Sequence, residues 1–188
     1  MKNYELVLLL DASLQEKERK EFTADFEKQI KDSIVEKDEI GLKTTVYNLH
    51  RVSGNNKFYF VSYQLKLTDE GIAAIKKSLL YTKVVSRYFL FLMTSDEEFL
   101  PLDKVQAALE KIINGWAEKK MGQKITFFSK PENEKYVSWK ALPMLKKYMT
   151  RFGNIKPRRY TANPVSIQKK VRQSIIRARE MGLLEYIK

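Results

Sequence analysis

The sequence predicts an α+β protein in which a sheet-forming N-terminal region precedes a small, basic helical region. Three observations support this prediction. Segments of strand length alternate with segments of helical period up to Met93. Beyond Met93 the pattern becomes mainly helical. The excess of positive charge lies at one end, because residues 136–188 carry 13 Lys and Arg against two Glu, whereas residues 1–135 carry 22 basic and 21 acidic side chains.

Four strands are expected in the first half. YELVLLLD (4–11) is an apolar run of strand length, and VVSRYFLFLM (84–93) is another mostly apolar run. EIGLKTTVYNL (39–49) and KFYFVSYQLKL (57–67) are rich in β-branched and aromatic residues. Gly54-Asn55-Asn56 lie between these two segments and tolerate positive φ, so the pair is predicted to form a β-hairpin.

Two helices are expected between these strands. Within residues 14–34, large apolar residues recur every four positions, at Phe22, Phe26, Ile30 and Ile34. Thr68 is predicted to cap a second helix that runs to Tyr81. The resulting order, βαββαβ, is that of the ferredoxin-like fold, a four-stranded antiparallel sheet with two helices on one face. We therefore expect a ferredoxin-like domain at residues 1–98.

The rest of the chain is expected to form a linker at 99–135 and a basic helical domain at 136–188. The linker is predicted to contain one helix, 103–120, with Asp103 as its N-cap, and then an extended piece.

The basic domain is predicted to contain two helices. Ser138 should cap a helix to about Arg151, with Gly153 in the left-handed conformation behind its last turn. Pro164 should occupy the first position of a last helix at 165–182.

The segment NIKPRRYTANPVSIQKKVRQSIIRARE (154–180) carries eight basic side chains and one acidic one. A charge asymmetry of this kind points to a polyanionic partner, nucleic acid or an anionic membrane. On a helical wheel a narrow apolar stripe faces away from most of the cations, and Pro157 stiffens a basic loop just upstream. A loop and a helix at an angle suit folded RNA better than a flat bilayer. The predicted RNA-binding residues are Lys156, Arg158, Arg159, Lys169, Lys170, Arg172, Arg177 and Arg179.

Other classes of function lack sequence support. There is no cysteine, no Gly-rich phosphate loop and no H-E-x-x-H motif, and His50, the one histidine, has no evident nucleophile to activate. We therefore expect no enzyme, no cofactor and no metal. Only five consecutive apolar residues, Leu6 to Leu10, precede Asp11, too few for a signal peptide or a membrane span, so a cytoplasmic protein is expected.

Residues 138–186 resemble bacterial small-subunit ribosomal protein eighteen. The matching elements are the W-K start, L-K-K-Y, G-N-I-K-P-R-R, Q-K-K, R-A-R and L-L-E-Y, without gaps over about 50 residues. Two positions depart from the family, which usually has Gly at position 162 and commonly a basic residue at position 176. Residues 1–98 resemble ribosomal protein six of the same subunit, in YEL, EIGLKTTVYNL, FYFVSYQL and VVSRYFLFLM.

The two resemblances together imply a natural fusion of two proteins that are neighbours on the platform of the small subunit. They imply a structural, ribosomal-RNA-binding role on the ribosome, with small-subunit (16S-type) RNA and adjacent ribosomal proteins as partners and a contact between the two halves. The alternative is a non-ribosomal RNA-binding protein with an RRM-like domain and a basic helical tail. NKFYFVSY (56–63) echoes the third-strand signature of that module, but the first strand lacks the aromatic residue that the module requires.

Overall fold

The computed structural model describes residues 1–49, 56–94, 97–116 and 127–187. The chain divides into two compact units. The N-terminal unit contains Met1–Thr44 and the described residues from 56 to Phe99. The C-terminal unit contains Leu100–Lys188 together with a short segment, Thr45–Leu49, which directly follows the second strand of the N-terminal unit. In the part of the chain that the structure describes, no helix is long and apolar enough to cross a membrane.

The N-terminal unit is built on a four-stranded antiparallel sheet, as the sequence predicts. The strands are β1 (Lys2–Asp11), β2 (Ile34–Thr44), β3 (Lys57–Leu67) and β4 (Val85–Leu92). Their spatial order is β2-β3-β1-β4, so β1 lies in the middle and pairs with both β3 and β4. This order and the intervening helices confirm the ferredoxin-like fold.

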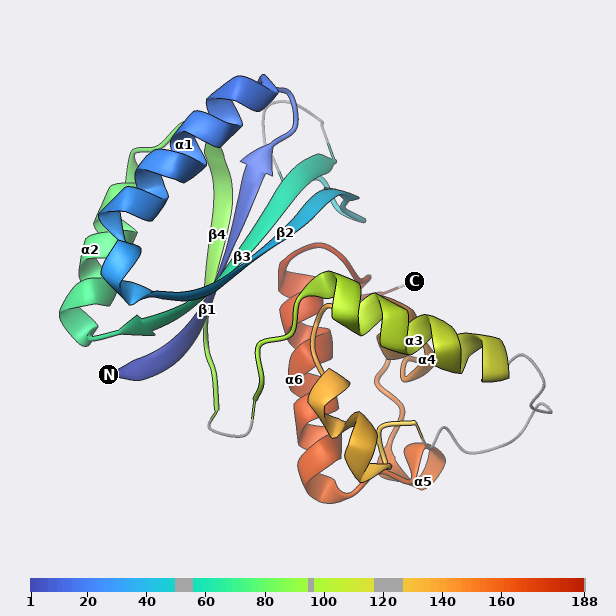
Figure 1. Cartoon of the computed structure of the whole chain (residues 1–188). Coiled ribbons are helices and arrows are strands. Elements are labelled where there is room, and N and C mark those ends of the chain that lie inside the picture. Colours follow the sequence, from blue (N-terminus) through green and yellow to red (C-terminus); the bar gives the residue numbers. More distant parts are fainter. Residues whose placement is uncertain (50–55, 95–96, 117–126, 188) are drawn as a thin grey trace. The chain divides into compact units, whose positions relative to one another are not determined.

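Two helices, α1 (Glu16–Gln29) and α2 (Asp69–Leu80), cover the same face of this sheet (Figure 1). Alternate residues of the strands point toward them, and Leu6, Leu8 and Leu10 of β1 are fully buried in the core. Phe26 of α1 and Ile75 of α2 complete the packing. The predicted cap of α2 is confirmed, because the Thr68 hydroxyl accepts a hydrogen bond from the Gly71 N–H at 3.3 Å.

Two boundaries of the N-terminal unit differ from the prediction. The first helix ends at Gln29 and is followed by a short 3₁₀ turn, so Ile34, expected in the helix, begins β2. The strand expected at 39–49 therefore starts earlier and ends at Thr44, opposite Lys57, the first residue of β3. Among the described residues the pairing of β2 with β3 extends no further, and the next residues belong to the C-terminal unit. The predicted turn at Gly54-Asn55-Asn56 lies largely outside the described residues.

The C-terminal unit contains helices α3 (Leu102–Trp116), α4 (Leu142–Lys147), α5 (Arg158–Thr161) and α6 (Val165–Glu180), and a 3₁₀ turn, η2 (Pro131–Tyr136). Val105 and Leu109 of α3 are buried, as their spacing predicts. Asp103 is not the N-cap of α3 but its second residue, because the Val105 N–H bonds to the Pro101 carbonyl. The expected end of this helix and most of the extended piece after it lie outside the described residues.

The helix predicted from Ser138 to Arg151 is wrong, since α4 has only six residues. It begins immediately before Pro143, which fits the first turn because proline has no N–H to offer. It ends because the Tyr148 carbonyl accepts the Lys156 N–H at 2.8 Å, and Met149 pairs with Ile155 in an antiparallel bridge. Residues 148–156 therefore form a hairpin, and Gly153 has the predicted positive φ, +85°, in its turn.

The segment around Pro157 is also more ordered than the predicted loop. Pro157 caps the one-turn helix α5, which holds both Arg158 and Arg159. Ala162 ends α5 in the left-handed conformation, with φ 54°. Pro164 is the N-cap of α6 rather than its first residue, and α6 ends two residues before the predicted boundary.

Candidate nucleic-acid interface

The eight predicted RNA-binding residues come from three adjacent elements of the C-terminal unit. Lys156 ends the hairpin that follows α4, Arg158 and Arg159 lie on α5, and the other five lie on α6. The hairpin turn needs a glycine, because a Cβ at Gly153 would meet the Tyr186 carbonyl oxygen at 2.5 Å. The polypeptide around residue 153 and the C-terminal residues after α6 therefore lie in direct contact.

A buried polar network joins α5 to α6 through the side chain of Gln168. Its Oε1 accepts hydrogen bonds from the Thr161 hydroxyl at 2.8 Å and from the Asn163 amide at 3.2 Å. Its Nε2 donates to the Lys156 carbonyl at 2.9 Å. Thr161 and Asn163 are fully buried, so each of these bonds satisfies a group that water does not reach. The network fixes the angle between the basic one-turn helix and the basic face of α6.

Arg158 takes part in the same network. Its Nε donates to the Asn163 carbonyl at 2.9 Å, which closes the turn between α5 and α6. The residue is exposed, so the side chain is oriented by one bond and keeps four further N–H donors for a ligand. A guanidinium held in this way loses less conformational entropy on meeting a phosphate than a side chain on a mobile tail.

A second oriented group is the buried Tyr148, which anchors the hairpin. Its hydroxyl accepts a hydrogen bond from the Phe128 N–H at 3.1 Å, and the two rings lie 5.2 Å apart. Burial raises the pKa of Tyr148 to about 12, although hydrogen bonds from the Phe128 backbone and the Asn163 side chain act in the opposite direction. The tyrosine thus stays neutral and connects the segment before η2 with the hairpin.

Four of the eight predicted residues are exposed cations: Arg158, described above, and Arg159, Lys169 and Arg172. Arg159 lies on α5, and its guanidinium sits 4.8 Å from the centre of the Tyr160 ring. Lys169 and Arg172 lie one turn apart on the exposed face of α6. Ile176 follows one turn later on the same face and is 37% exposed, so a hydrophobic side chain interrupts the cationic row.

The remaining predicted cations are partly engaged within the unit. Lys156 donates to the Lys147 carbonyl at 2.9 Å, and Lys170 forms a 2.7 Å ion pair with Glu134. Arg179 donates to the carbonyl of Gly153 and, at 3.0 Å, to that of Glu185. These bonds keep the positive charges but restrict where the side chains can reach.

Arg177 departs furthest from the sequence pattern. The helical wheel places it among the solvent-facing cations, but it is only 8% exposed. It lies on the flank of α6 beside the buried stripe, which is wider than the stripe of Ile167, Val171, Ile175 and Ala178 because Ser174 is buried as well. The expected separation of an apolar face from a fully cationic face is therefore incomplete.

Two further exposed cations, Lys146 and Arg151, lie near this interface and were not among the predicted residues. Lys146 belongs to the last turn of α4, and Arg151 lies in the hairpin with its guanidinium 5.3 Å from the centre of the Phe152 ring. Their only sequence signal is that they belong to the basic last quarter of the chain. The sequence pattern of this segment predicted one continuous helix, so it gave no indication of the hairpin that contains Arg151.

Within the C-terminal unit, the short segment Thr45–Leu49 bonds to the residues that follow α6. The Val46 N–H donates to the Gly182 carbonyl at 2.7 Å, and the Tyr47 hydroxyl accepts a hydrogen bond from the Tyr186 N–H. The rings of Tyr47 and Tyr186 lie 6.2 Å apart. Gly182 has φ +73°, and a Cβ there would lie 3.2 Å from the Cβ of Thr45. The segment is therefore held by the residues that follow α6.

Comparison with known proteins identifies relatives of the basic C-terminal part of the chain. The family model described as ribosomal protein S18 matches residues 133–184. Small ribosomal subunit protein bS18 of Mycoplasma capricolum is 40% identical over 68 residues, which cover 36% of this chain and 89% of that protein. The bS18 protein of Lactobacillus acidophilus is 42% identical over 52 residues, covering 28% of this chain and 67% of that protein.

Among solved structures, 30S ribosomal protein S6 from Thermotoga maritima aligns with 60% of this chain and 97% of that chain, with 13% identity and a TM-score of 0.44. The sequence relationship rests on the C-terminal part. Its identity to bS18 proteins and the family match agree on the segment that contains the hairpin, α5 and α6. By this relationship, the chain belongs to the ribosomal protein S18 family.

Proposed function

We propose that this protein is a structural constituent of the small ribosomal subunit that binds small-subunit (16S-type) ribosomal RNA and aids its assembly on the platform. One observation carries the proposal: the S18-family part of the chain holds almost all of the net positive charge and presents it from α5 and α6. The four exposed cations Arg158, Arg159, Lys169 and Arg172 are proposed to contact phosphates. Lys156, Lys170, Arg177 and Arg179 are proposed to contribute charge and to fix the shape of the surface.

The N-terminal unit is proposed to be the equivalent of ribosomal protein six, which makes the chain a natural fusion with domains at 1–98 and 136–188. Its ferredoxin-like topology and the quoted strand motifs support this assignment. We further propose that the two halves contact each other. The covalent connection favours such a contact, because a tether replaces free diffusion by an effective concentration of about the millimolar range.

The proposed role is non-enzymatic and sited on cytoplasmic ribosomes, with neighbouring small-subunit proteins as further partners. The RRM-like alternative gains no support from the sheet. On the face away from the helices, β1 presents Glu5, Val7 and Leu9, so no aromatic residue stands where an RRM stacks a base on this strand.

Co-sedimentation of the full chain with small ribosomal subunits tests the proposal. We expect the protein to migrate with the small subunit and to remain bound through a high-salt wash, because contacts to folded RNA are specific as well as electrostatic. With purified RNA, phosphate contacts from these four cations would give a slope of log K against log salt on the order of −3 to −4. Release from the subunit at moderate salt, or equal affinity for an unrelated RNA of the same length, would contradict a ribosomal role.

A further inference from the structure

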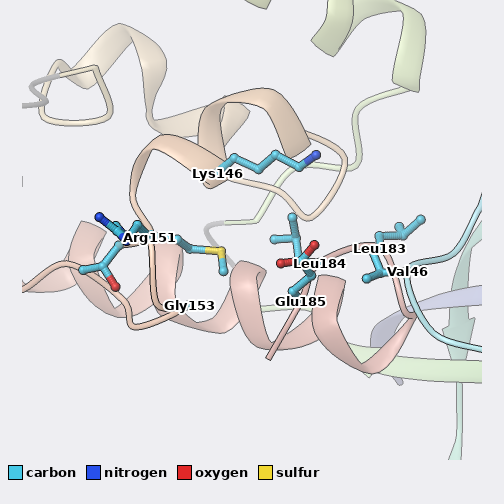
Figure 2. Close-up of a pocket in the computed structure, with 9 residues that line it drawn as sticks. Val46, Lys146, Arg151, Gly153, Leu183, Leu184 and Glu185 are labelled. Carbon is cyan, nitrogen blue, oxygen red and sulfur yellow. The ribbon is translucent and has the colours of Figure 1, made fainter. Parts of the chain in front are cut away.

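A cavity of about 270 Å³ lies between the hairpin that follows α4 and the residues that follow α6 (Figure 2). It is separate from the exposed cationic faces of α5 and α6, because none of the eight predicted residues lines it. Its lining residues are Val46, Lys146, Met149, Thr150, Arg151, Gly153, Leu183, Leu184 and Glu185. All of them belong to the C-terminal unit.

The walls of this cavity combine an apolar floor with a charged rim. Met149, Leu183 and Leu184 supply apolar surface, and the two leucines are almost completely buried. Lys146 and Arg151 are exposed cations at the rim, where Figure 2 shows them on separate parts of the hairpin and α4. Glu185 is the one acidic residue in the lining, so the site carries a net positive charge. A phosphate alone would use the cations but not the apolar floor.

Planar groups flank the same cavity. The Arg151 guanidinium lies over the ring of Phe152, which is 65% exposed. Tyr186 follows Glu185, and its ring is half exposed. The Arg179 guanidinium lies over this ring, 5.5 Å from its centre. Aromatic rings and arginine planes are the surfaces on which unpaired bases stack in proteins that bind single-stranded RNA.

We propose that this cavity receives one unpaired nucleotide of the bound RNA. Its base would lie on the floor of Met149, Leu183 and Leu184, and its phosphate would meet a cation of the rim, Lys146 or Arg151. This inference rests on the proposed RNA-binding function. The cavity would bind one unpaired nucleotide, whereas the exposed cations of α5 and α6 are proposed to bind phosphates of the RNA backbone.

Val46 makes the site composite. It belongs to the segment that follows β2, and its backbone N–H is bonded to the Gly182 carbonyl, so it stands at the wall of the cavity beside Leu183. The nucleotide site is therefore complete only when this segment of the C-terminal unit is in place.

Methyl NMR of the full chain tests the site directly. Nucleoside 5′-monophosphates are titrated against the methyl signals of Met149, Leu183 and Val46, and inorganic phosphate and free nucleosides serve as separate probes. We expect saturable shifts with the nucleotides, weaker shifts with nucleosides and none with phosphate. No shift with any nucleotide would overturn the proposal, and so would equal shifts with phosphate, since the latter would indicate an anion site without a base.

Paired variants separate this site from general charge. The double variant Lys146→Gln/Arg151→Gln should weaken nucleotide binding about fivefold or more, because it removes charge-assisted hydrogen bonds at a partly exposed site. The matched control Lys130→Gln/Lys135→Gln removes the same charge from exposed lysines outside the cavity and should leave nucleotide binding unchanged. Equal weakening by both pairs would overturn the site.

Binding to small-subunit RNA distinguishes a wrong site from a wrong function. We expect the cavity variant to lose about tenfold more affinity than the matched control, because it loses a defined contact as well as charge. If both variants bind this RNA equally, the cavity is not an RNA site and the ribosomal proposal still stands. If the unaltered chain shows no preference for small-subunit RNA, the proposed function is wrong. The nucleotide titration then still shows whether the cavity binds a nucleotide.

Discussion

The two units handle their positive charges differently. In the N-terminal unit, lysines pair with nearby carboxylates, as in Lys20 with Glu16 at 2.7 Å and Lys37 with both Glu27 and Glu39. In the C-terminal unit acidic partners are scarce, and the cations bond to backbone carbonyls instead. Examples are Lys140 with Leu100, Lys156 with Lys147, Arg158 with Asn163 and Arg179 with Gly153.

This difference explains how a basic unit can fold and still attract a polyanion. A cation bonded to a carboxylate is neutralised, but a cation bonded to a carbonyl keeps its full charge and adds to the field of the unit. Arg19 of the N-terminal unit also bonds to carbonyls, those of Ala12 and Leu14, but it lies among many acidic residues. The carbonyl-bonded cations of the C-terminal unit therefore have a structural and an electrostatic effect at once.

The largest expected effect is on RNA affinity. The triple variant Arg159→Ala/Lys169→Ala/Arg172→Ala should weaken binding to small-subunit RNA about 1,000-fold, or about 4 kcal/mol, because each residue is exposed and free to meet a phosphate. The N-terminal triple Lys17→Ala/Lys31→Ala/Lys76→Ala removes the same charge from exposed lysines and should change affinity about twofold at most. Filter binding measures both, and similar losses would mean that net charge alone governs binding.

The next effect concerns the polar network of the C-terminal unit. Gln168→Ala should lower the stability of that unit by about 3 kcal/mol, because it removes the buried acceptor of both the Thr161 hydroxyl and the Asn163 amide N–H. Hydrogen exchange should accelerate in α5 and α6 and remain unchanged in β1 and β3, whose core is apolar. Uniform acceleration over both units would show that they unfold as one body.

High pH should weaken the C-terminal unit through Tyr148. Its pKa is raised from the ordinary value of 10.0 to about 12 in the folded chain, so the unfolded chain loses this proton first. Stability from this group is complete below pH ~10 and falls by about 1.4 kcal/mol per pH unit until pH ~12. Denaturant unfolding of the unaltered chain and of Tyr148→Phe over this range gives the measurement. Parallel pH curves would contradict the burial effect.

The same experiment applies to the N-terminal unit through Tyr63. Burial raises the pKa of this tyrosine strongly, and its hydroxyl donates to Glu27 at 3.0 Å. Tyr63→Phe should therefore also reduce the loss of stability above pH ~10. The comparison would show whether the stability of the two units responds equally to alkali.

The smallest effect concerns two residues with the same backbone conformation. Ala162 ends α5 with φ 54°, and Gly41 lies at a bulge in β2 with φ +81°. Ala162→Gly should raise stability by about 1 kcal/mol, because it relieves the left-handed strain of a residue with a Cβ. Gly41→Ala should lower it by about 1 kcal/mol through strain alone, because a Cβ there meets nothing within 4 Å. Thermal unfolding of both variants gives the comparison.

Some elements were determined by the sequence alone, because their causes are local. The β-branched and aromatic residues of 57–67 predicted both ends of β3, and the Thr68 hydroxyl lies beside the N–H group that it caps. The charge asymmetry and the S18-like motifs are likewise properties of the sequence, and they were sufficient to identify the family and to locate the candidate interface in the last quarter of the chain.

Other features were decided only by tertiary structure, because they depend on partners distant in sequence. The sequence predicted residues 45–49 as the end of a strand. In the structure β3 begins opposite Thr44, and the Val46 N–H bonds to the Gly182 carbonyl instead. The helix predicted to Arg151 stops at Lys147, because the Lys156 N–H takes the Tyr148 carbonyl. The burial of Arg177 and the bonds of Arg179 to carbonyls also come from packing. A wheel of α6 shows which cations share a face, but only the folded chain decides which of them remain exposed to a phosphate.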